Sequence, residues 1–245
     1  MKYIEVKEER DYITITFNLK SEKYFYNLDF LLQLLDTLSY IESLNKYKFA
    51  IFKSDGESFG RGIGIAELLN ANRSRERASS LARYLYEIYK RLIELNKLKI
   101  AIINGSIMNE SLDMLLCMDI LIAKADTEIS DNRLQIGLNS PLLYTLGPFI
   151  LPSNIIKRLT IMGQKINVTD LQEYIDFTSD IPYEKSIDII KQIQNLNVSI
   201  YNYNLKRNLF ELIDERLKKE FSEYVELITR IELRNVLLSK ANEFS

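Results

Sequence analysis

Histidine and tryptophan are absent from this 245-residue chain, and cysteine occurs once, at Cys117. Without histidine the chain cannot use Ser-His-Asp or Cys-His catalysis, an HExxH metalloprotease site or a His-ligated zinc ion. One thiol forms neither an internal disulfide nor a cysteine metal cluster, which fits a reducing compartment. We therefore expect no metal and no bound cofactor. Any catalysis has to use carboxylates, lysine, tyrosine, serine or backbone groups.

The chain also lacks a strong net charge and a long apolar run. Its 32 Lys and Arg residues nearly balance 34 Asp and Glu residues, so the formal net charge is -2. This gives no overall attraction to nucleic acid or anionic lipid. No apolar stretch approaches the roughly 20 residues of a membrane helix, and MKYIEVKEERDY is charged too early for a signal peptide. We expect a soluble, cytoplasmic protein that binds neither membrane nor nucleic acid.

Strand and helix patterns alternate over the first 150 residues, which is typical of an α/β fold. Apolar and polar side chains alternate over residues 2–17, around a polar turn, and indicate a β-hairpin. Leucine and isoleucine recur at helical spacing in residues 26–46 and again from Ser74. Short apolar stretches predict further strands at residues 49–52, 98–105 and 120–123, with a short helix over residues 111–119.

The sequence pattern changes after residue 150. All four prolines lie between residues 141 and 182, and the chain beyond Ser153 has mainly helical patterns. We divide the sequence into an α/β core, residues 1–150, and a mainly helical C-terminal layer, residues 151–245. The C-terminal helices carry more apolar surface than a lone tail can bury, so we expect them to contribute to oligomerisation.

Glycine is scarce, with eight in the chain, yet Gly60, Gly62 and Gly64 fall within five residues directly after a predicted strand. Such a cluster indicates a backbone that needs positive φ or close approach by another group. The loop is either a tight turn into the next helix or a ligand-binding loop whose N–H groups face a substrate. The GxGxxG spacing of a dinucleotide fold and the GKS/GKT of a phosphate loop are both missing.

A second group of candidate residues lies where a strand ends at Gly105 and a helix begins. Asn109 is a candidate N-cap, and Glu110 and Asp113 lie in the first helical turn. The two acids either complement the helix dipole or, if their shared face lines a pocket, form a general acid/base pair with one raised pKa.

The run NRSRERASSLARYLYEIYKRL combines arginines with tyrosines, a pattern that also occurs in nucleic-acid-binding proteins. Glutamates at positions 76, 87 and 94 balance its charge. We favour a solvated helix face over a nucleic-acid-binding surface.

Taken in order, several segments resemble the crotonase (enoyl-CoA hydratase/isomerase) superfamily. FAIFKSDGESFGRGIGIAELL is similar to the family's strand and F-x-x-G-x-D loop. KLKIAIINGSIMNESLDMLLCMDILIA is similar to its A-x-x-N-G-x-x-x-G-G-G-x-E-L-x-x-x-C-D stretch, and IIKRLTIMGQKINVTDLQEYIDF to its L-T-G region. The resemblance implies a ββα spiral core with a C-terminal helical region.

The resemblance also implies a chemistry. Family members bind an acyl-CoA thioester and stabilise its enolate between two backbone N–H groups, the oxyanion hole. By position these are the amides of Ile63 and Glu110, with Gly60, Gly62 and Gly64 in the substrate loop. CoA would be substrate or ligand, and the activity would be of lyase or isomerase type, in fatty acid metabolism.

Departures from the family pattern alter the expected mechanism. Asn109, Glu110 and Ser111 replace the usual Gly-Gly-Gly, and Gly64 replaces the loop aspartate. The first family glutamate aligns with Asp113, but the second aligns with Arg133, which is no base at ordinary pH. Two-carboxylate hydration is therefore not supported.

Two hypotheses remain open from the sequence. In the first, Asp113 is the single catalytic acid of an isomerase-like reaction, with Arg133 and Arg61 as possible substrate contacts. In the second, the chain is a catalytically impaired member that binds CoA esters or a protein partner. In both, the resemblance implies a homotrimer or hexamer.

Overall fold

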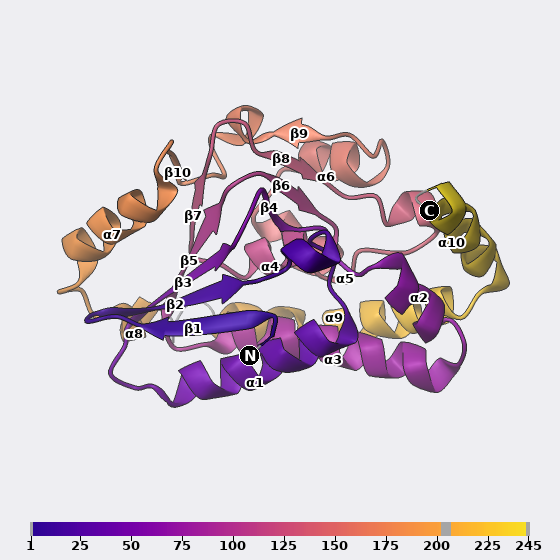
Figure 1. Cartoon of the computed structure of the whole chain (residues 1–245), viewed down its shortest axis with the longest axis horizontal. Coiled ribbons are helices and arrows are strands. Elements are labelled where there is room, and N and C mark those ends of the chain that lie inside the picture. The colour runs from indigo at the N-terminus through magenta and orange to yellow at the C-terminus, as the bar shows by residue number, and fades with distance from the viewer. Residues whose placement is uncertain (1, 202–206, 244–245) are drawn as a thin grey trace.

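Two β-sheets form the centre of the molecule (Figure 1). The structure is a computed structural model that describes residues 2–201 and 207–243. The first sheet has the order β1-β2-β3-β5-β7-β10 and the second the order β4-β6-β8-β9. The strands of the first sheet are β1 (Ile4–Glu8), β2 (Tyr12–Phe17), β3 (Phe49–Ser54), β5 (Leu98–Ile103), β7 (Ile120–Ala123) and β10 (Phe177–Thr178). Those of the second are β4 (Ser58–Gly60), β6 (Ser106–Met108), β8 (Glu128–Ser130) and β9 (Ile166–Asn167).

The chain winds through the sheets as a spiral of repeated strand pairs. Each of the pairs β3–β4, β5–β6 and β7–β8 gives its first strand to the larger sheet and its second to the smaller one. Successive turns pair in parallel, both along β2, β3, β5 and β7 and along β4, β6 and β8. The ββα spiral implied by the sequence resemblance is therefore confirmed. The N-terminal hairpin is confirmed as well, since β1 pairs with β2 in antiparallel fashion.

Helices follow the strand pairs and dominate the C-terminal third. The α-helices are α1 (Leu28–Ser43), α2 (Ile65–Ala71), α3 (Arg75–Glu94), α4 (Glu110–Leu116), α5 (Pro141–Thr145), α6 (Ser153–Thr160), α7 (Pro182–Ile193), α8 (Val198–Tyr201), α9 (Arg207–Ile228) and α10 (Ile231–Glu243). Short 3-10 helices are η1 (Lys20–Glu22), η2 (Leu134–Ile136), η3 (Gly147–Phe149) and η4 (Val168–Leu171). The side chains of Asn27 and Ser74 cap α1 and α3 by accepting an N–H of the first turn.

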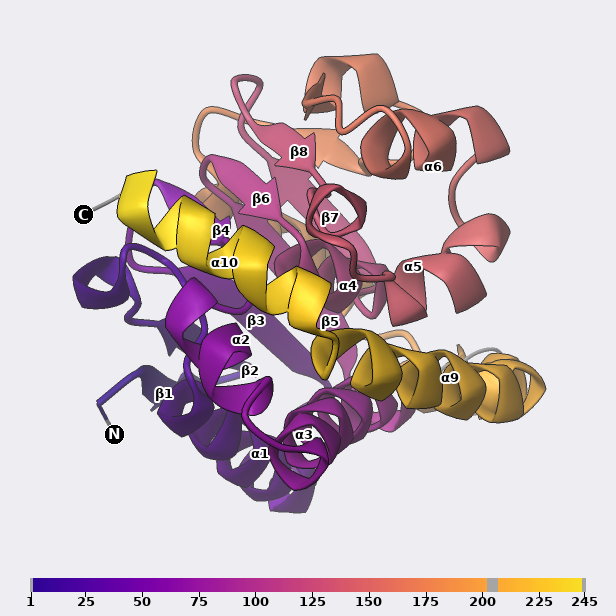
Figure 2. The same ribbon diagram turned by 90° about the vertical axis from the view of Figure 1, so that its right-hand side faces the viewer.

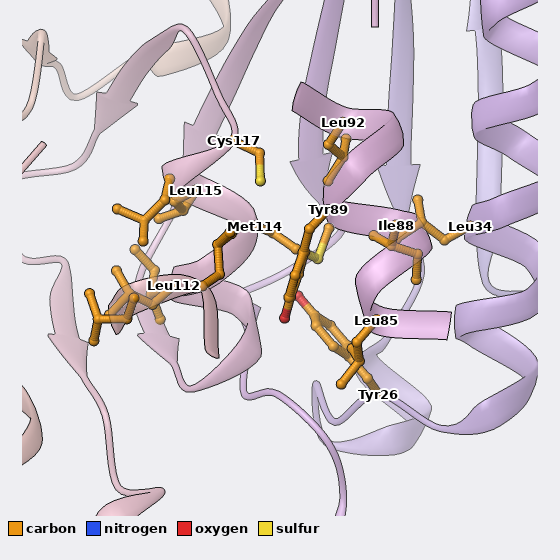
Figure 3. Close-up of a cluster of buried hydrophobic side chains, with 14 of the residues drawn as sticks. Tyr26, Leu34, Leu85, Ile88, Tyr89, Leu92, Leu112, Met114, Leu115 and Cys117 are labelled. Carbon is orange, nitrogen blue, oxygen red and sulfur yellow. The ribbon is translucent and has the colours of Figure 1, made fainter. Parts of the chain in front are cut away.

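Both faces of the larger sheet are buried at its central strands β3 and β5, and successive side chains of these strands point to opposite faces. Along β3, Ala50 and Phe52 join the main hydrophobic core, whereas Phe49 and Ile51 join a smaller cluster with Ile189 and other residues of α7. The main core extends between α3 and α4, where the side chains of the two helices face each other (Figure 3). This packing fixes α4, the helix that carries the candidate acids.

The C-terminal helices pack against the spiral core. Helix α9 lies along α3, and α10 contacts α2 and η2 as it crosses the front of the view in Figure 2. The side-chain amide of Asn72 fixes the turn between α9 and α10 by donating to the carbonyl oxygens of Ile228 and Arg230, 2.6 and 3.0 Å away. Beyond residue 150 the chain also supplies β9 and β10, one strand to each sheet.

The helices of the described part of the chain were compared with the length and apolar character of a membrane-spanning segment. Among the helices in residues 2–201 and 207–243, none combines the length and the apolar character needed to cross a bilayer.

Candidate functional site

The three clustered glycines serve different purposes. Gly60 ends β4 where a Cβ atom would lie 2.3 Å from the Tyr26 hydroxyl and 2.5 Å from Ser111 Oγ. Gly62 has φ of +77°, in the region that favours glycine. Gly64 precedes α2 with an ordinary φ of −67°. The expectation of close approach or positive φ therefore holds for Gly60 and Gly62, but not for Gly64.

Asn109 occupies the N-cap position of α4 but does not cap it with its side chain. The predicted N-cap position of Asn109 is therefore confirmed, but its side chain makes no capping hydrogen bond. Its backbone has φ of +54° and ψ of −122°, and its side chain points to two other segments. Oδ1 accepts the N–H of Asn132 at 2.8 Å, and Nδ2 donates to the carbonyl oxygen of Arg61 at 3.4 Å. Asn109 thereby joins the glycine loop, α4 and the end of β8.

Glu110 and Ser111 turn their side chains back onto the glycine loop. The backbone N–H of Ile63 donates to Glu110 Oε2 at 2.8 Å, and the N–H of Gly62 donates to Ser111 Oγ at 3.1 Å. The Glu110 carboxylate and the Glu110 backbone nitrogen also lie close to one another, since both would lie within 3.0 Å of a Cβ atom on Gly62. Of the two amides that the resemblance assigns to a thioester oxygen, that of Ile63 thus donates to a carboxylate of this chain, and that of Glu110 lies near the same group.

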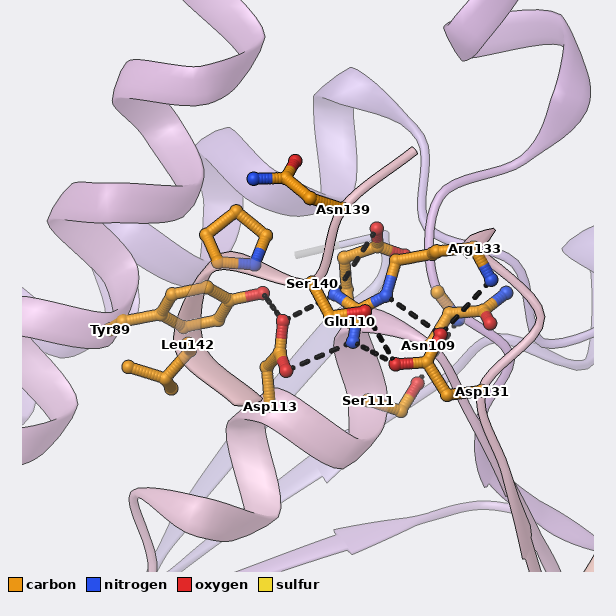
Figure 4. Close-up of polar contacts among 12 residues, drawn as sticks. Tyr89, Asn109, Glu110, Ser111, Asp113, Asp131, Arg133, Asn139, Ser140 and Leu142 are labelled. Atoms are coloured by element: carbon orange, nitrogen blue, oxygen red, sulfur yellow. Dashed lines mark hydrogen bonds and ion pairs between the residues drawn. The ribbon is translucent and has the colours of Figure 1, made fainter. Parts of the chain in front are cut away.

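Arg133 forms the centre of the acidic cluster (Figure 4). Its guanidinium makes one bidentate pair with Asp113, through Nη1 to Oδ2 and through Nη2 to Oδ1 at 3.0 Å. A second bidentate pair joins it to Asp131, through Nε to Oδ1 at 3.1 Å and Nη2 to Oδ2 at 2.8 Å. Glu110 Oε1 lies 3.7 Å from Nη1. Arg133 is 1% exposed, so these contacts are shielded from water.

Hydroxyl groups complete the cluster. The Tyr89 hydroxyl donates to Asp113 Oδ2 at 3.2 Å, and the Ser140 hydroxyl donates to Asp131 Oδ2 at 2.7 Å. The Tyr224 hydroxyl, from α9, donates to Glu110 Oε1 at 3.4 Å. Each carboxylate therefore has a neutral donor in addition to the guanidinium, and α3 and α9 are tied to α4 through polar contacts as well as apolar ones.

Burial and the guanidinium act on the carboxylates in opposite directions. Burial raises the pKa of Glu110 and of Asp113, and the nearby Arg133 offsets part of that shift in each case. Burial also acts on Asp131, but Arg133 and the Ser140 hydroxyl outweigh it, so the pKa of Asp131 is lowered. Three carboxyl groups share one guanidinium. The pKa of Glu110 and of Asp113 is therefore shifted upward and that of Asp131 downward, although all three lie at the same guanidinium.

The two arginines predicted to touch substrate differ in their surroundings: Arg133 is held by ion pairs, whereas the buried Nε of Arg61 has no hydrogen-bond partner among the described residues. The Arg133 guanidinium faces Asp113 and Asp131 rather than an open surface. The Arg61 guanidinium lies 6.0 Å from the ring centre of Phe25. A substrate contact by either side chain stays a prediction, and for Arg133 it requires the buried cluster to rearrange.

The site residues are closed off from solvent. Glu110, Asp113 and Arg133 are 3%, 0% and 1% exposed, so the site is a buried, hydrogen-bonded part of the interior. Three pockets of about 360, 430 and 550 Å³ are lined by other residues of the described part of the chain. Within residues 2–201 and 207–243, no three or more acidic or cysteine side chains are arranged to hold a metal ion.

Sequence analysis found Glu110, Asp113 and Arg133 but missed Asp131, Tyr89 and Tyr224. Asp131 stands two residues before Arg133, a spacing that suggests a local pair around the end of a strand. The two tyrosines belong to helical apolar stripes, where their hydroxyl groups cannot be distinguished by pattern from ordinary core contacts. Only the packing of α3, α4 and α9 reveals their role.

The paired sheets, their spiral winding and a helix N-terminus facing a glycine loop define a crotonase fold. The family profile described as enoyl-CoA hydratase/isomerase matches residues 8–174 of this chain. The chain therefore belongs to the enoyl-CoA hydratase/isomerase family. A comparison with curated protein sequences finds no significant match.

Solved structures share the fold at low sequence identity. An enoyl-CoA hydratase/isomerase from Mycobacterium paratuberculosis superposes with a TM-score of 0.89 at 17% identity, covering 98% of each chain. An enoyl-CoA hydratase from Bacillus halodurans also gives 0.89, at 18% identity, covering 97% of this chain and 99% of its own. An enoyl-CoA hydratase/isomerase from Pseudoalteromonas atlantica gives 0.87 at 16% identity, covering 99% and 98%. At this identity the likeness shows the fold alone.

Proposed function

We propose that this chain is a non-catalytic member of its family that acts as a subunit of a protein assembly. The carrying observation is the position of the Glu110 carboxylate, which accepts the N–H of Ile63 and lies against its own backbone amide. In the family chemistry implied by the resemblance, these amides receive a thioester oxygen. Here a side chain of the protein supplies the oxygen, so a substrate would have to displace a buried, hydrogen-bonded carboxylate.

Arg133 supports the same proposal. It stands where family hydratases carry their second glutamate, and it holds the first acid position, Asp113, in a bidentate pair. Both oxygens of the Asp113 carboxylate are occupied by the guanidinium, so neither is open to a water molecule or a substrate. The two groups that would activate water are thus replaced by a buried ion pair.

Exposed apolar side chains support the role in an assembly. Phe149, Ile161 and Met162, at the two ends of the segment containing α6, are 58%, 66% and 64% exposed. Apolar exposure of this kind is typical of protein contacts. We propose that the partner is another copy of the chain, in a trimer or hexamer. Sedimentation that shows a stable monomer at micromolar concentration would contradict this.

The catalytic part of the proposal is tested by calorimetric titration with acyl-CoA esters of short, medium and long chain, saturated and 2-enoyl. The wild type is expected to show no saturable binding and no hydration or isomerisation. Glu110→Gly is expected to bind at least one ester, because it frees both amides without removing either. Ser43→Gly, a change on the exposed end of α1, serves as the control and is expected to behave as wild type. Turnover by the wild type would overturn the proposal.

A second candidate function follows from the convergence of the Ile63 and Glu110 amides on a single carboxylate. If the Glu110 side chain swings out when substrate arrives, the same amides could stabilise an enolate. Asp113, whose pKa is raised by burial, would take a proton from one carbon of an enoyl-CoA and return it to another.

The two functions give different results with Asp113→Asn. Isomerase activity in the wild type that disappears in Asp113→Asn would establish the second candidate. Activity that is unchanged in Asp113→Asn would exclude the proton-transfer role of this residue. Absence of activity in both proteins, with correct folding of each, supports the non-catalytic function.

A further inference from the structure

The two oxygens of the Glu110 carboxylate face different parts of the chain. Oε2 accepts the N–H of Ile63 in the glycine loop at 2.8 Å, and Oε1 accepts the hydroxyl of Tyr224 in α9 at 3.4 Å. Glu110 and Tyr224 are 3% and 1% exposed, so both contacts are shielded from water. The side chain that meets the Ile63 amide is therefore also held by a helix residue 114 positions further along the chain.

Helix α9 reaches the acidic cluster at a second point, through Glu220. Asn139 Nδ2 donates to the carbonyl oxygen and to Oε2 of Glu220, at 3.1 and 3.2 Å. The residue that follows Asn139 donates from its hydroxyl to Asp131 at 2.7 Å. Because Glu220 and Tyr224 are four positions apart, they lie on the same face of α9. One face of this helix therefore contacts the cluster at Glu110 directly and at Asp131 through one intervening segment.

Aromatic packing between α9 and α3 determines where the Tyr224 ring lies. Phe221, about one turn earlier in α9, stands edge-on to Tyr224 with the ring centres 6.1 Å apart. The same Phe221 ring lies 6.1 Å from that of Tyr86 and 6.0 Å from that of Tyr89, both in α3. The hydroxyl of Tyr86 donates to Asp214 of α9 rather than to an acid of the cluster. The Tyr224 hydroxyl is thus placed by helix packing outside α4, the helix that carries the candidate acids.

We propose that Tyr224 is a positioning residue that keeps the Glu110 side chain on the glycine loop, so that α9 controls the access of a ligand to the Ile63 and Glu110 amides. A buried carboxylate oxygen without a donor is unfavourable. If the Tyr224 hydroxyl is removed, the cation of Arg133 remains, but its Nη1 lies 3.7 Å from Oε1, beyond a normal hydrogen bond. The closed arrangement of Glu110 is thereby weakened.

The shared face of α9 means that its two contacts with the site act together. A displacement of α9 from α3 would part Tyr224 from Glu110 and Glu220 from Asn139 in one step. The ligand that such a displacement admits is the acyl-CoA ester of the family chemistry. The inference rests on the proposed function, because it takes Glu110 as the group that excludes such an ester.

The first measurement is calorimetric titration of the full chain with the same acyl-CoA esters. Tyr224→Phe keeps the aromatic ring and removes the hydroxyl alone. It should bind at least one ester that Glu110→Gly also binds, more weakly than Glu110→Gly does, whereas the wild type should bind none. Tyr86→Phe is the matched control, because it removes a hydroxyl from the same interface of α3 and α9 without touching the cluster, and it should behave as wild type.

The second measurement reads the position of the Glu110 carboxylate itself. In the full chain with isotope-labelled isoleucine, the nuclear magnetic resonance of the Ile63 amide should titrate with pH as Glu110 ionises, and Glu110→Gln should abolish this titration. Tyr224→Phe should move the midpoint upward by about 0.5–1 pH unit, because the ionised carboxylate loses a donor. Tyr86→Phe should leave the midpoint in place. The other charged groups of the cluster are the same in all these proteins: Asp113, Asp131 and Arg133.

Either measurement can overturn the proposal. An unchanged midpoint, or the absence of ester binding to a folded Tyr224→Phe protein when Glu110→Gly binds, contradicts the control by α9. Ester binding to the wild type, or none to Glu110→Gly, contradicts the proposed function instead, and the midpoint alone then decides the role of Tyr224. If Tyr224→Phe does not fold, Asn139→Ala replaces it, since it releases Glu220 of α9 and should change binding and midpoint in the same directions.

Discussion

Glu110 and Ile63, 47 positions apart in the chain, are joined by a hydrogen bond of 2.8 Å from the Ile63 backbone N–H to the Glu110 carboxylate. The bond links the glycine loop after β4 to the first turn of α4. The bond fills the space between these two segments with a side chain of the protein, and this is the basis of the proposal that the chain is non-catalytic. Its partners also connect it to Arg133 and, through Tyr224, to α9.

Arg133→Leu is expected to destabilise the fold by about 3–5 kcal/mol, because it leaves Asp113 and Asp131 buried without their shared cation. Urea denaturation monitored by circular dichroism measures the change. Arg83→Leu, at an exposed position of α3, is the control and should change the free energy of unfolding by no more than about 0.5 kcal/mol. Similar small effects of both substitutions would contradict the structural role of the cluster.

Glu110→Gln is expected to gain stability relative to wild type as the pH rises. Burial, the largest influence, raises the folded-state pKa of Glu110 above its ordinary value of 4.5, against the opposing effect of Arg133. The stability from protonating Glu110 is therefore fully present below pH 4.5 and is lost as the pH rises through the folded pKa. Glutamine stays neutral and does not lose it.

The measurement for Glu110→Gln is the free energy of unfolding of both proteins at pH values from 4.5 upward. The difference between them should grow by about 1.4 kcal/mol for each unit by which the folded pKa exceeds the unfolded one. A constant difference over this range would show that Glu110 is not shifted upward. Asp131, with a lowered pKa, contributes in the opposite sense, but it does so equally in both proteins.

Gly60→Ala and Gly64→Ala form a matched pair in the glycine loop. The new Cβ at position 60 would lie 2.3 Å from the Tyr26 hydroxyl, which is buried, so we expect a loss of about 1–3 kcal/mol in the free energy of unfolding. At position 64 the nearest atom is 3.5 Å away and φ is ordinary, so alanine should be neutral or slightly stabilising. Equal losses in thermal or urea denaturation would contradict the assigned close approach.

Leu217→Ala tests how firmly the C-terminal layer is joined to the core. Leu217 of α9 is fully buried in the main hydrophobic cluster, so its truncation should cost about 2–5 kcal/mol. Leu212, on the same helix, is 69% exposed, and Leu212→Ala should have little effect on the monomer. If residues 151–245 were an independent layer, Leu217→Ala would produce a separate, early unfolding transition instead of a shift of the single one.

Sequence patterns predicted the elements with strong periodicity. The alternation of apolar and polar side chains in residues 2–17 predicted the hairpin of β1 and β2. The helical stripe from Ser74 predicted α3 together with its start, where the Ser74 side chain caps the helix. The sequence pattern beyond residue 150 predicted that this part of the chain is mainly helical, but it did not predict the strands β9 and β10. Those strands are two residues each and carry no periodicity.

The sequence pointed to three residues of the buried cluster, but it revealed neither the remaining members nor the arrangement of the side chains. Position in the chain identified Glu110, Asp113 and Arg133, yet it could not show that these side chains bind one another. That outcome depends on the direction of each side chain, which the packing of α4 against its neighbours determines. Asn109 shows the same limit, since its type suggested a cap while its left-handed backbone sends the side chain to Asn132 and Arg61.

The amides of Ile63 and Glu110 belong to the main chain, so no substitution at either position, proline aside, can delete them. Only the Glu110 side chain stands between them and an outside oxygen. Exchanging this one side chain would therefore expose the pair of donors again, whereas the ion pair of Asp113 with Arg133 would stay in place.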